Sequence, residues 1–193
     1  IESFKKSLAF FAEAEPDAFI MADPGMIRFV IKEFPRVPVH LSVQTNTINW
    51  PSVEFWHDLG VKRIILSREL SIQEIKEIHQ RVPGIEMESF VHGAICIAWS
   101  GRCLLSNYFN HRDANQGTCT NSCRWEYNTY KDTAVDRPVS DIKEDSGNFY
   151  IEEVNRLGEL MPIEEDEHGT YIMNSKDLRA IEFLRELRDA GVG

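Results

Sequence analysis

Residues 61–91 read VKRIILSRELSIQEIKEIHQRVPGIEMESFV and predict a strand, a helix and a second strand in succession. Val61–Leu66 is a short, mostly apolar run, as in a buried strand. Ser71 is a helix-capping residue, and Glu74 three positions later completes a capping box for the helix that follows. Ile85–Val91 returns to a strand pattern. Two strands joined by a helix in this way are typical of a parallel sheet with a right-handed crossover.

The same alternation of helices and strands precedes this stretch. The expected elements are a helix over Glu2–Glu13, a strand over Ala18–Ala22, a helix over Pro24–Phe34, a strand over Val37–Val43 and a helix over Pro51–Leu59. Repeating strand–helix units predict an α/β fold whose parallel sheet is either a barrel or open.

The pattern changes after Val91. A cysteine-rich segment over residues 93–130 and a polar loop over residues 131–147 come next. The expected elements beyond them are short antiparallel strands over Phe149–Val154, Leu157–Pro162 and Gly169–Met173, and a closing helix over Lys176–Ala190. That helix would be capped by Ser175 and would carry an apolar stripe of Leu178, Ile181, Leu184 and Leu187.

The last residues repeat a pattern seen earlier in the chain. Asp189-Ala190-Gly191-Val192 matches Asp58-Leu59-Gly60-Val61, which leads from a helix into a strand. A further strand is therefore expected beyond Gly193. We expect residues 1–193 to form one partial barrel domain, cut at both ends, with the cysteine-rich segment 93–130 inside it.

Composition narrows the class of protein. The chain has 193 residues, 42% hydrophobic and 27% charged, as is ordinary for a globular protein in solution. A formal net charge of −10 disfavours nonspecific binding to nucleic acid or to anionic membranes. No apolar run approaches the roughly 20 residues needed to cross a bilayer. We expect a cytoplasmic protein that does not bind membranes.

All four cysteines fall in the spacing Cys96-x6-Cys103-x15-Cys119-x3-Cys123. Four thiolates can ligate zinc or a [4Fe–4S] cluster. Structural zinc sites usually use two short knuckles, and only the last pair has such spacing, so the irregular pattern favours a cluster. Zinc and redox-active thiols stay open as alternatives, and Cys96 can also be a core residue that ends an apolar strand.

Catalytic candidates lie at the C-terminal ends of the expected parallel strands, where barrel enzymes place their active sites. Arg68 can bind a carboxylate or phosphate, or can form a salt bridge with Glu69 or Glu88. Glu88 is a candidate site residue, or one half of a structural ion pair, with Arg68 as a possible partner. His92 is a candidate general acid–base or an interior histidine. Other polar residues at these ends are Asp23, Gln44 and Asn46.

The cysteine-rich segment is locally basic, with Arg102, His111, Arg112 and Arg124. These residues can contact RNA phosphates while Tyr108, Phe109 or Trp125 stacks on a base. The alternative, which we favour slightly, is that they offset the negative charge of a thiolate cluster.

Residues 88–106 carry a recognisable signature. Glu88-Ser-Phe90-Val-His-Gly93-Ala94-Ile95-Cys96 is followed, after four residues, by Gly101-Arg-Cys103-Leu-Leu105-Ser106. This pattern resembles the signature of the U32 peptidase family at every fixed position. Further similar segments are Asn110-His111-Arg112, Gly117-Thr118-Cys119, Cys123-Arg124-Trp125 and Asn174-Ser175-Lys176-Asp177-Leu178.

The resemblance implies a TIM-like barrel and oxygen-independent hydroxylation of wobble uridine in tRNA, of a ribosomal RNA cytidine or of ubiquinone precursors. Prephenate is the implied source of the hydroxyl, and cysteine-ligated iron–sulfur clusters occur in several members. The chain resembles most the branch that forms 5-hydroxyuridine in tRNA. On this basis we expect a [4Fe–4S] cluster on Cys96, Cys103, Cys119 and Cys123, prephenate as co-substrate and tRNA as partner.

Two other functions stay open. The family name implies a peptidase, yet the chain has no Gly-x-Ser-x-Gly elbow and no His-Glu-x-x-His helix. A cysteine peptidase would have to use Cys96 with His92. A structural zinc module is the second alternative.

Overall fold

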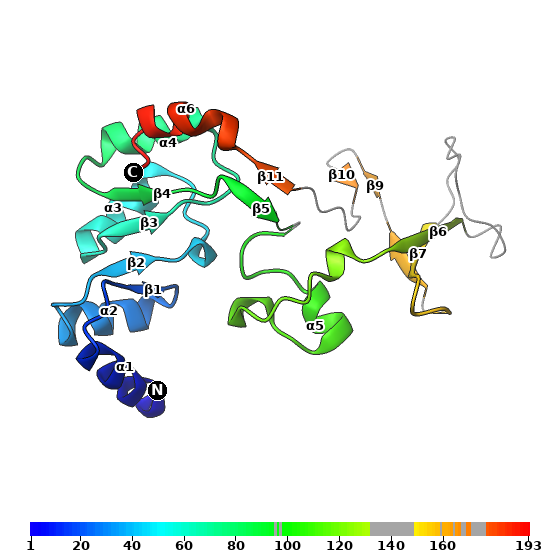
Figure 1. The fold of residues 1–193 in the computed structure, drawn as a ribbon, viewed down its shortest axis with the longest axis horizontal. Coiled ribbons are helices and arrows are strands. Elements are labelled where there is room, and N and C mark those ends of the chain that lie inside the picture. Colours follow the sequence, from blue (N-terminus) through cyan, green and yellow to red (C-terminus); the bar gives the residue numbers. More distant parts are fainter. Residues whose placement is uncertain are drawn as a thin grey trace. The chain divides into compact units, whose positions relative to one another are not determined.

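The computed structural model describes residues 1–94, 96, 98–131, 149–158, 160–163, 165–166, 169–170 and 177–193. The chain divides into two compact units (Figure 1). The first unit comprises Ile1–Arg102 with Asp177–Gly193, and the second comprises Cys103–Lys176. The sequence predicted one domain, with the cysteine segment inside it.

A four-stranded parallel sheet forms the centre of the first unit (Figure 1). Its strands are β1 (Phe19–Met21), β2 (Val39–Leu41), β3 (Arg63–Ile65) and β4 (Glu86–Glu88), in the order β1-β2-β3-β4. The connecting helices are α2 (Pro24–Glu33), α3 (Trp50–Leu59) and α4 (Ile72–Arg81), and α1 (Glu2–Glu13) precedes β1. The predicted α/β alternation with a parallel sheet is confirmed.

Local capping explains where the crossover helices begin. Asp23 accepts a hydrogen bond from the Met26 N–H at 2.8 Å, so it has a structural role at the start of α2. Ser71 and Glu74 form the predicted capping box, since each side chain bonds the backbone N–H of the other residue. Gly60 ends α3 with a φ of 109°, a conformation that favours glycine.

The core lies between one face of this sheet and the helices. Strand residues that are almost fully buried include Val39, Leu41, Ile64 and Met87. They pack with helix residues Ile27, Val30, Val53, Ile75 and Ile78. Burial of this many branched side chains supplies the main stabilisation of the first unit.

The opposite face of the sheet is largely polar. Ile20, on this face, is 63% exposed. The strand register places Ile20 of β1, His40 of β2, Arg63 of β3 and Glu86 of β4 side by side across this face. Burial and then the charge of Arg63 lower the pKa of His40. Ile65, on the same face, is buried. A parallel sheet normally buries both faces, so a face with side chains as exposed as Ile20 is unusual.

The end of the chain returns to the sheet unit by a route that differs from the prediction. Instead of one helix over Lys176–Ala190, strand β11 (Asp177–Arg179) pairs antiparallel with β5 (His92–Ala94). A 3₁₀ turn, η4 (Ile181–Phe183), and a short helix, α6 (Leu184–Asp189), follow. Helix α6 contacts α4 (Figure 1).

The predicted apolar stripe is therefore divided between two elements. Leu178 lies in a strand opposite Gly93, and of the remaining members only Leu187 is buried. The Ala180 N–H donates to Val91 O at 2.7 Å. In the predicted helix this N–H would have bonded a carbonyl one turn earlier in the same helix, whereas here it bonds the residue that precedes β5. The predicted cap, Ser175, lies outside the described residues.

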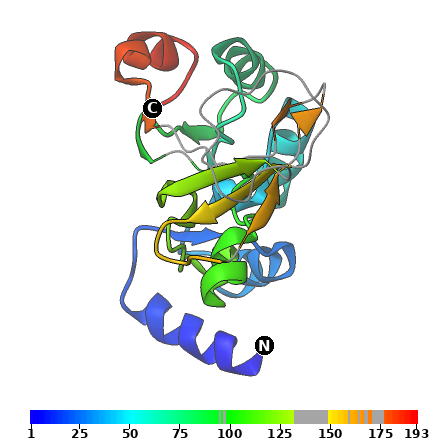
Figure 2. The same cartoon turned by 90° about the vertical axis from the view of Figure 1, so that its right-hand side faces the viewer.

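The second unit contains a short helix, 3₁₀ turns and antiparallel strands. Strands β6 (Tyr127–Lys131), β7 (Phe149–Glu153) and β8 (Met161–Ile163) form one sheet, seen side by side in Figure 2. The other elements are α5 (Leu105–Asn110), η2 (Ala114–Gln116), η3 (Ser122–Arg124), β9 (Glu165–Asp166) and β10 (Gly169–Thr170).

The structure confirms that the strands beyond residue 148 in the second unit pair antiparallel. Strand β6 was not predicted from the sequence. Strand β8 begins at Met161 rather than at Leu157. Nearly all of the predicted polar loop falls in 132–148, outside the described residues. None of the described helices is long and apolar enough to cross a bilayer.

Candidate functional site

Arg68, just beyond the end of β3, binds the segment that carries Cys96. Its Nη1 donates to Cys96 O at 2.9 Å, and its Nη2 donates to Ala98 O at 2.9 Å and to Ser100 Oγ at 3.2 Å. The alternative salt bridges to Glu69 and Glu88 are absent from the described structure. Arg68 therefore anchors a loop, which no local sequence pattern could reveal.

The loop after β2 holds the same segment from a second strand end. Asn46, in the left-handed conformation at φ 51°, donates from Nδ2 to Ser100 O at 3.3 Å. Gly101 has a φ of 75°, and a Cβ there would lie 3.3 Å from the Gln44 side chain. The C-terminal ends of β2 and β3 thus fix residues 98–101. Both Gln44 and Asn46 were among the polar residues expected at these ends.

A pocket of ≈ 200 Å³ brings together three of the predicted site residues. Arg68, His92 and Cys96 line it, and the remaining lining residues are Phe90, Ser100 and Leu178. His92 and Cys96 are both exposed, so neither is the interior residue that the sequence allowed. An imidazole, a thiol and a fixed guanidinium around one pocket can bind an anionic small molecule and transfer a proton.

Glu88 is not among the residues lining that pocket. Its Oε2 lies 3.5 Å from Arg63 Nη1, while Glu86 Oε2 lies 2.8 Å from Arg63 Nη2. The structural ion pair foreseen for Glu88 therefore exists with Arg63 instead of Arg68, because the register of β3 and β4 places Arg63 opposite Glu86. Glu88 and His92 belong to strands of different sheets. The catalytic role of Glu88 stays a prediction.

The other three cysteines belong to the second unit. Cys103 is buried, Cys123 is half-buried in η3, and Cys119 is exposed. Cys119 Sγ accepts a hydrogen bond from the Asn121 N–H at 3.3 Å, and such bonds stabilise thiolates in metal and cluster sites.

A network of hydroxyl groups supports these cysteines. Thr120 Oγ1 lies 3.2 Å from Ser106 Oγ and 2.8 Å from Ser122 Oγ, and it accepts from Asn110 Nδ2 at 3.1 Å. Ser106 and Ser122 are buried. The network joins α5 to the turn between Cys119 and Cys123. Sequence reasoning missed it, although the Ser and Thr residues beside the cysteines were a usable signal.

In the part of the chain that the structure describes, none of the four cysteines forms a disulfide, so their chemistry fits thiolate ligation. Within the described ranges, however, no three His, Cys, Asp or Glu side chains lie close enough together to hold a metal ion. Ligation by all four cysteines stays a prediction, and no geometry is assigned to it.

Tyr127, at the start of β6, donates its hydroxyl to Ser122 O at 2.7 Å. Burial, followed by electrostatic interactions with Glu153 and Cys123, raises the pKa of Tyr127 to about 12. A tyrosine in an unfolded chain ionises near pH ~10, so the folded state binds the proton more tightly. Its contribution to stability is complete below pH ~10 and is lost as the pH rises to about 12.

A spectrophotometric titration tests this assignment. Compared with the Tyr127→Phe variant, the wild type should show one additional phenol that ionises near pH 12. An additional phenol that ionises near pH ~10 would contradict the buried, hydrogen-bonded position of this residue.

The basic and aromatic residues of the segment differ in accessibility. Arg102, His111, Arg112 and Arg124 are exposed, and whether they contact RNA phosphates or offset the charge of a thiolate cluster stays open. Tyr108 is exposed, whereas Phe109 is 8% exposed. Phe109 packs against Trp125 with ring centroids 5.4 Å apart, so stacking of Phe109 on an RNA base is excluded.

Comparison with known proteins shows the family to which the chain belongs. The model of peptidase family U32 matches residues 1–193, and the chain belongs to this family. It is 51% identical to tRNA hydroxylation protein P of Escherichia coli and 48% identical to the protein of that name from Haemophilus influenzae. Each match covers 100% of this chain and 46% of the relative, so the chain spans about half their length.

A solved structure, that of the U32 peptidase Mk0906, is also similar. It is 22% identical, with a TM-score of 0.43, and the match covers 48% of this chain and 38% of the other.

Proposed function

We propose that the protein containing this chain hydroxylates the wobble uridine of tRNA to 5-hydroxyuridine, without oxygen and with prephenate as hydroxyl donor. The observation that carries the proposal is the 51% identity, over all of this chain, to a tRNA hydroxylation protein. A tRNA substrate would place the reaction in the cytoplasm.

The chemistry demands an electron acceptor. Replacing C–H with C–OH at the uracil ring is a two-electron oxidation. Transfer of the hydroxyl from prephenate would balance it if the donor carbon exchanges its C–OH for C–H, so that prephenate is both the oxygen source and the two-electron acceptor. A [4Fe–4S] cluster held by Cys96, Cys103, Cys119 and Cys123 would supply one-electron transfer.

The chain's own residues have separate roles in this proposal. Arg68 positions the backbone from residue 96 to 100 through three hydrogen bonds. His92 would hold or transfer a proton at an imidazole nitrogen beside the pocket. The carboxylates of prephenate would bind among Arg68, His92 and Ser100, because a guanidinium favours carboxylates.

We also propose that the sheet β1-β2-β3-β4 is part of a TIM-like barrel. Consecutive parallel strands that are neighbours in the sheet, with a helix between each strand and the next, are the repeating unit of that fold. The polar face with Ile20, His40 and Arg63 would then face the barrel interior.

The function is tested with full-length protein purified without oxygen. Incubation with unmodified tRNA and prephenate, followed by mass spectrometry of nucleosides, should give 5-hydroxyuridine. The same preparation should contain iron and sulfide and absorb near ~400 nm. A colourless protein with stoichiometric zinc would contradict the cluster and favour a structural zinc module.

A cysteine peptidase is the second candidate, because Cys96 and His92 line one pocket. It predicts that the purified protein cleaves unfolded polypeptide and that Cys96→Ala abolishes the cleavage. Cleavage that survives both Cys96→Ala and His92→Ala would exclude this pocket as a peptidase site.

A further inference from the structure

A second pocket lies within the second unit, where the start of β6 meets the end of β7. The antiparallel register pairs Tyr127 with Glu153, and the Val154 N–H donates to Glu126 O at 3.0 Å. The pocket has a volume of ≈ 450 Å³, within the range of about 300–1,000 Å³ for small-ligand sites. Its lining residues are Arg124, Trp125, Glu126, Glu153, Asn155 and Arg156.

Arg156 is held in one position by its neighbours. Its Cζ lies 4.9 Å from the ring centroid of Phe109 and 5.3 Å from that of Trp125. Nη2 also donates to Phe109 O at 3.3 Å and to Asn110 Oδ1 at 3.5 Å. A planar cation and an indole ring are therefore in place before a ligand binds, which lowers the entropic cost of binding.

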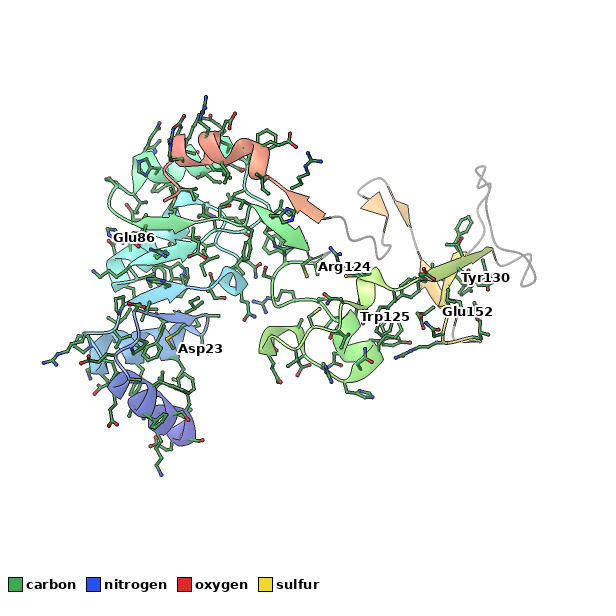
Figure 3. All side chains as sticks on the ribbon, in the orientation of Figure 1. Asp23, Glu86, Arg124, Trp125, Tyr130 and Glu152 are labelled. Atoms are coloured by element: carbon green, nitrogen blue, oxygen red, sulfur yellow. The ribbon has the colours of Figure 1, made fainter. Side chains whose placement is uncertain are left out.

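The remaining lining residues supply charge of both signs. Arg124 in η3 is exposed, and it is labelled next to Trp125 in Figure 3. Glu153 is only 3% exposed and accepts from Asn155 Nδ2 at 3.0 Å, while Glu126 is exposed. The pocket thus offers guanidinium groups, carboxylate acceptors and an aromatic surface.

This combination matches the parts of an unpaired nucleotide. A base can stack on an indole or guanidinium plane, its N–H groups can donate to a carboxylate, and its phosphate can bind an arginine. Free phosphate fits less well, since it would meet two carboxylates. In a chain with a net charge of −10, RNA binding also needs local cationic sites of this kind.

We propose that this pocket binds one unpaired nucleotide of the RNA substrate, with the base against Trp125 and Arg156 and the phosphate at Arg124. The identity of the RNA as tRNA rests on the proposed function. The pocket would then bind substrate beside Cys123, the proposed cluster ligand that directly precedes Arg124.

The test measures binding of a fluorescently labelled, unmodified tRNA transcript to full-length protein over a series of salt concentrations. Arg124→Ala should weaken binding and reduce the slope of log K against log salt by roughly 0.7 to 1, because one phosphate contact is lost. Trp125→Leu should weaken binding by roughly 5- to 100-fold with the slope unchanged, because stacking is lost without a change of charge.

Arg185→Ala is the matched control, since it removes the same charge from an exposed position on α6. It should leave both affinity and slope at wild-type values. Unchanged affinity and slope for Arg124→Ala would overturn the proposal, and so would an equal effect of Arg185→Ala. If Trp125→Leu loses its fold by circular dichroism, Arg124→Ala decides alone.

Failure of this pocket and failure of the proposed function give different results. If the wild type forms 5-hydroxyuridine and Arg124→Ala binds tRNA normally, the pocket proposal is wrong and the function stands. If no 5-hydroxyuridine forms but Arg124→Ala and Trp125→Leu weaken RNA binding as described, the nucleotide pocket stands and the reaction is wrong.

Discussion

Replacing Arg68 with methionine should reduce tRNA hydroxylation by about 100-fold while the protein still folds. The guanidinium donates to two backbone carbonyls and one hydroxyl between residues 96 and 100. Methionine fills similar space but donates no hydrogen bond, so the segment that carries Cys96 would shift. A shift of about 1 Å near reacting groups can cost about two orders of magnitude in rate.

Arg185→Met is the matched control for this prediction. It makes the same substitution at an exposed position on α6. The rate of this variant should stay within about 2-fold of the wild type. Arg68→Lys should recover part of the loss in kcat, since an ammonium can still reach one carbonyl. Equal rates for Arg68→Met and the wild type would contradict the positioning role.

The second large effect is a loss of stability on truncation of a core residue of the first unit. Ile64 in β3 is fully buried between β2 and β4, so Ile64→Ala should lower the free energy of unfolding by about 2–5 kcal/mol in a urea titration. Typical proteins have only about 5–15 kcal/mol in total, so this variant would be close to unfolding.

Ile20→Ala on β1 shows whether the opposite face of the sheet is covered. In this chain the residue is 63% exposed, and an alanine there would cost less than about 0.5 kcal/mol. In the full-length protein, a barrel would bury Ile20, and the loss should exceed about 1 kcal/mol. A loss below about 0.5 kcal/mol in the full-length protein would contradict the barrel.

Local patterns predicted the local features of the fold. The capping box of Ser71 and Glu74 and the proline-initiated start of α2 involve residues at most three positions apart, so both could be predicted from sequence. The pairing of β11 with β5 places Leu178 opposite Gly93, and a pairing between residues so far apart in the sequence cannot be predicted from local patterns. Leu178 fitted a helical stripe, yet the open edge of β5 determined its conformation.

The same distinction applies to the candidate site. The positions of Arg68, His92 and Cys96 near strand ends followed from the expected parallel sheet, and one pocket brings them together. The hydrogen-bond partners of Arg68 lie 28 to 32 residues away in the sequence, so a salt bridge with nearby Glu69 was an equally reasonable expectation. The role of Arg156 was missed because its aromatic neighbours, Phe109 and Trp125, are far from it in the sequence.

Nucleoside analysis of tRNA from a deletion strain tests the central claim most directly. Loss of the gene should remove 5-hydroxyuridine and nucleosides derived from it, and the wild-type gene should restore them, whereas a gene with Cys96→Ala and Cys103→Ala should not. Unchanged 5-hydroxyuridine in the deletion strain would contradict the proposed function.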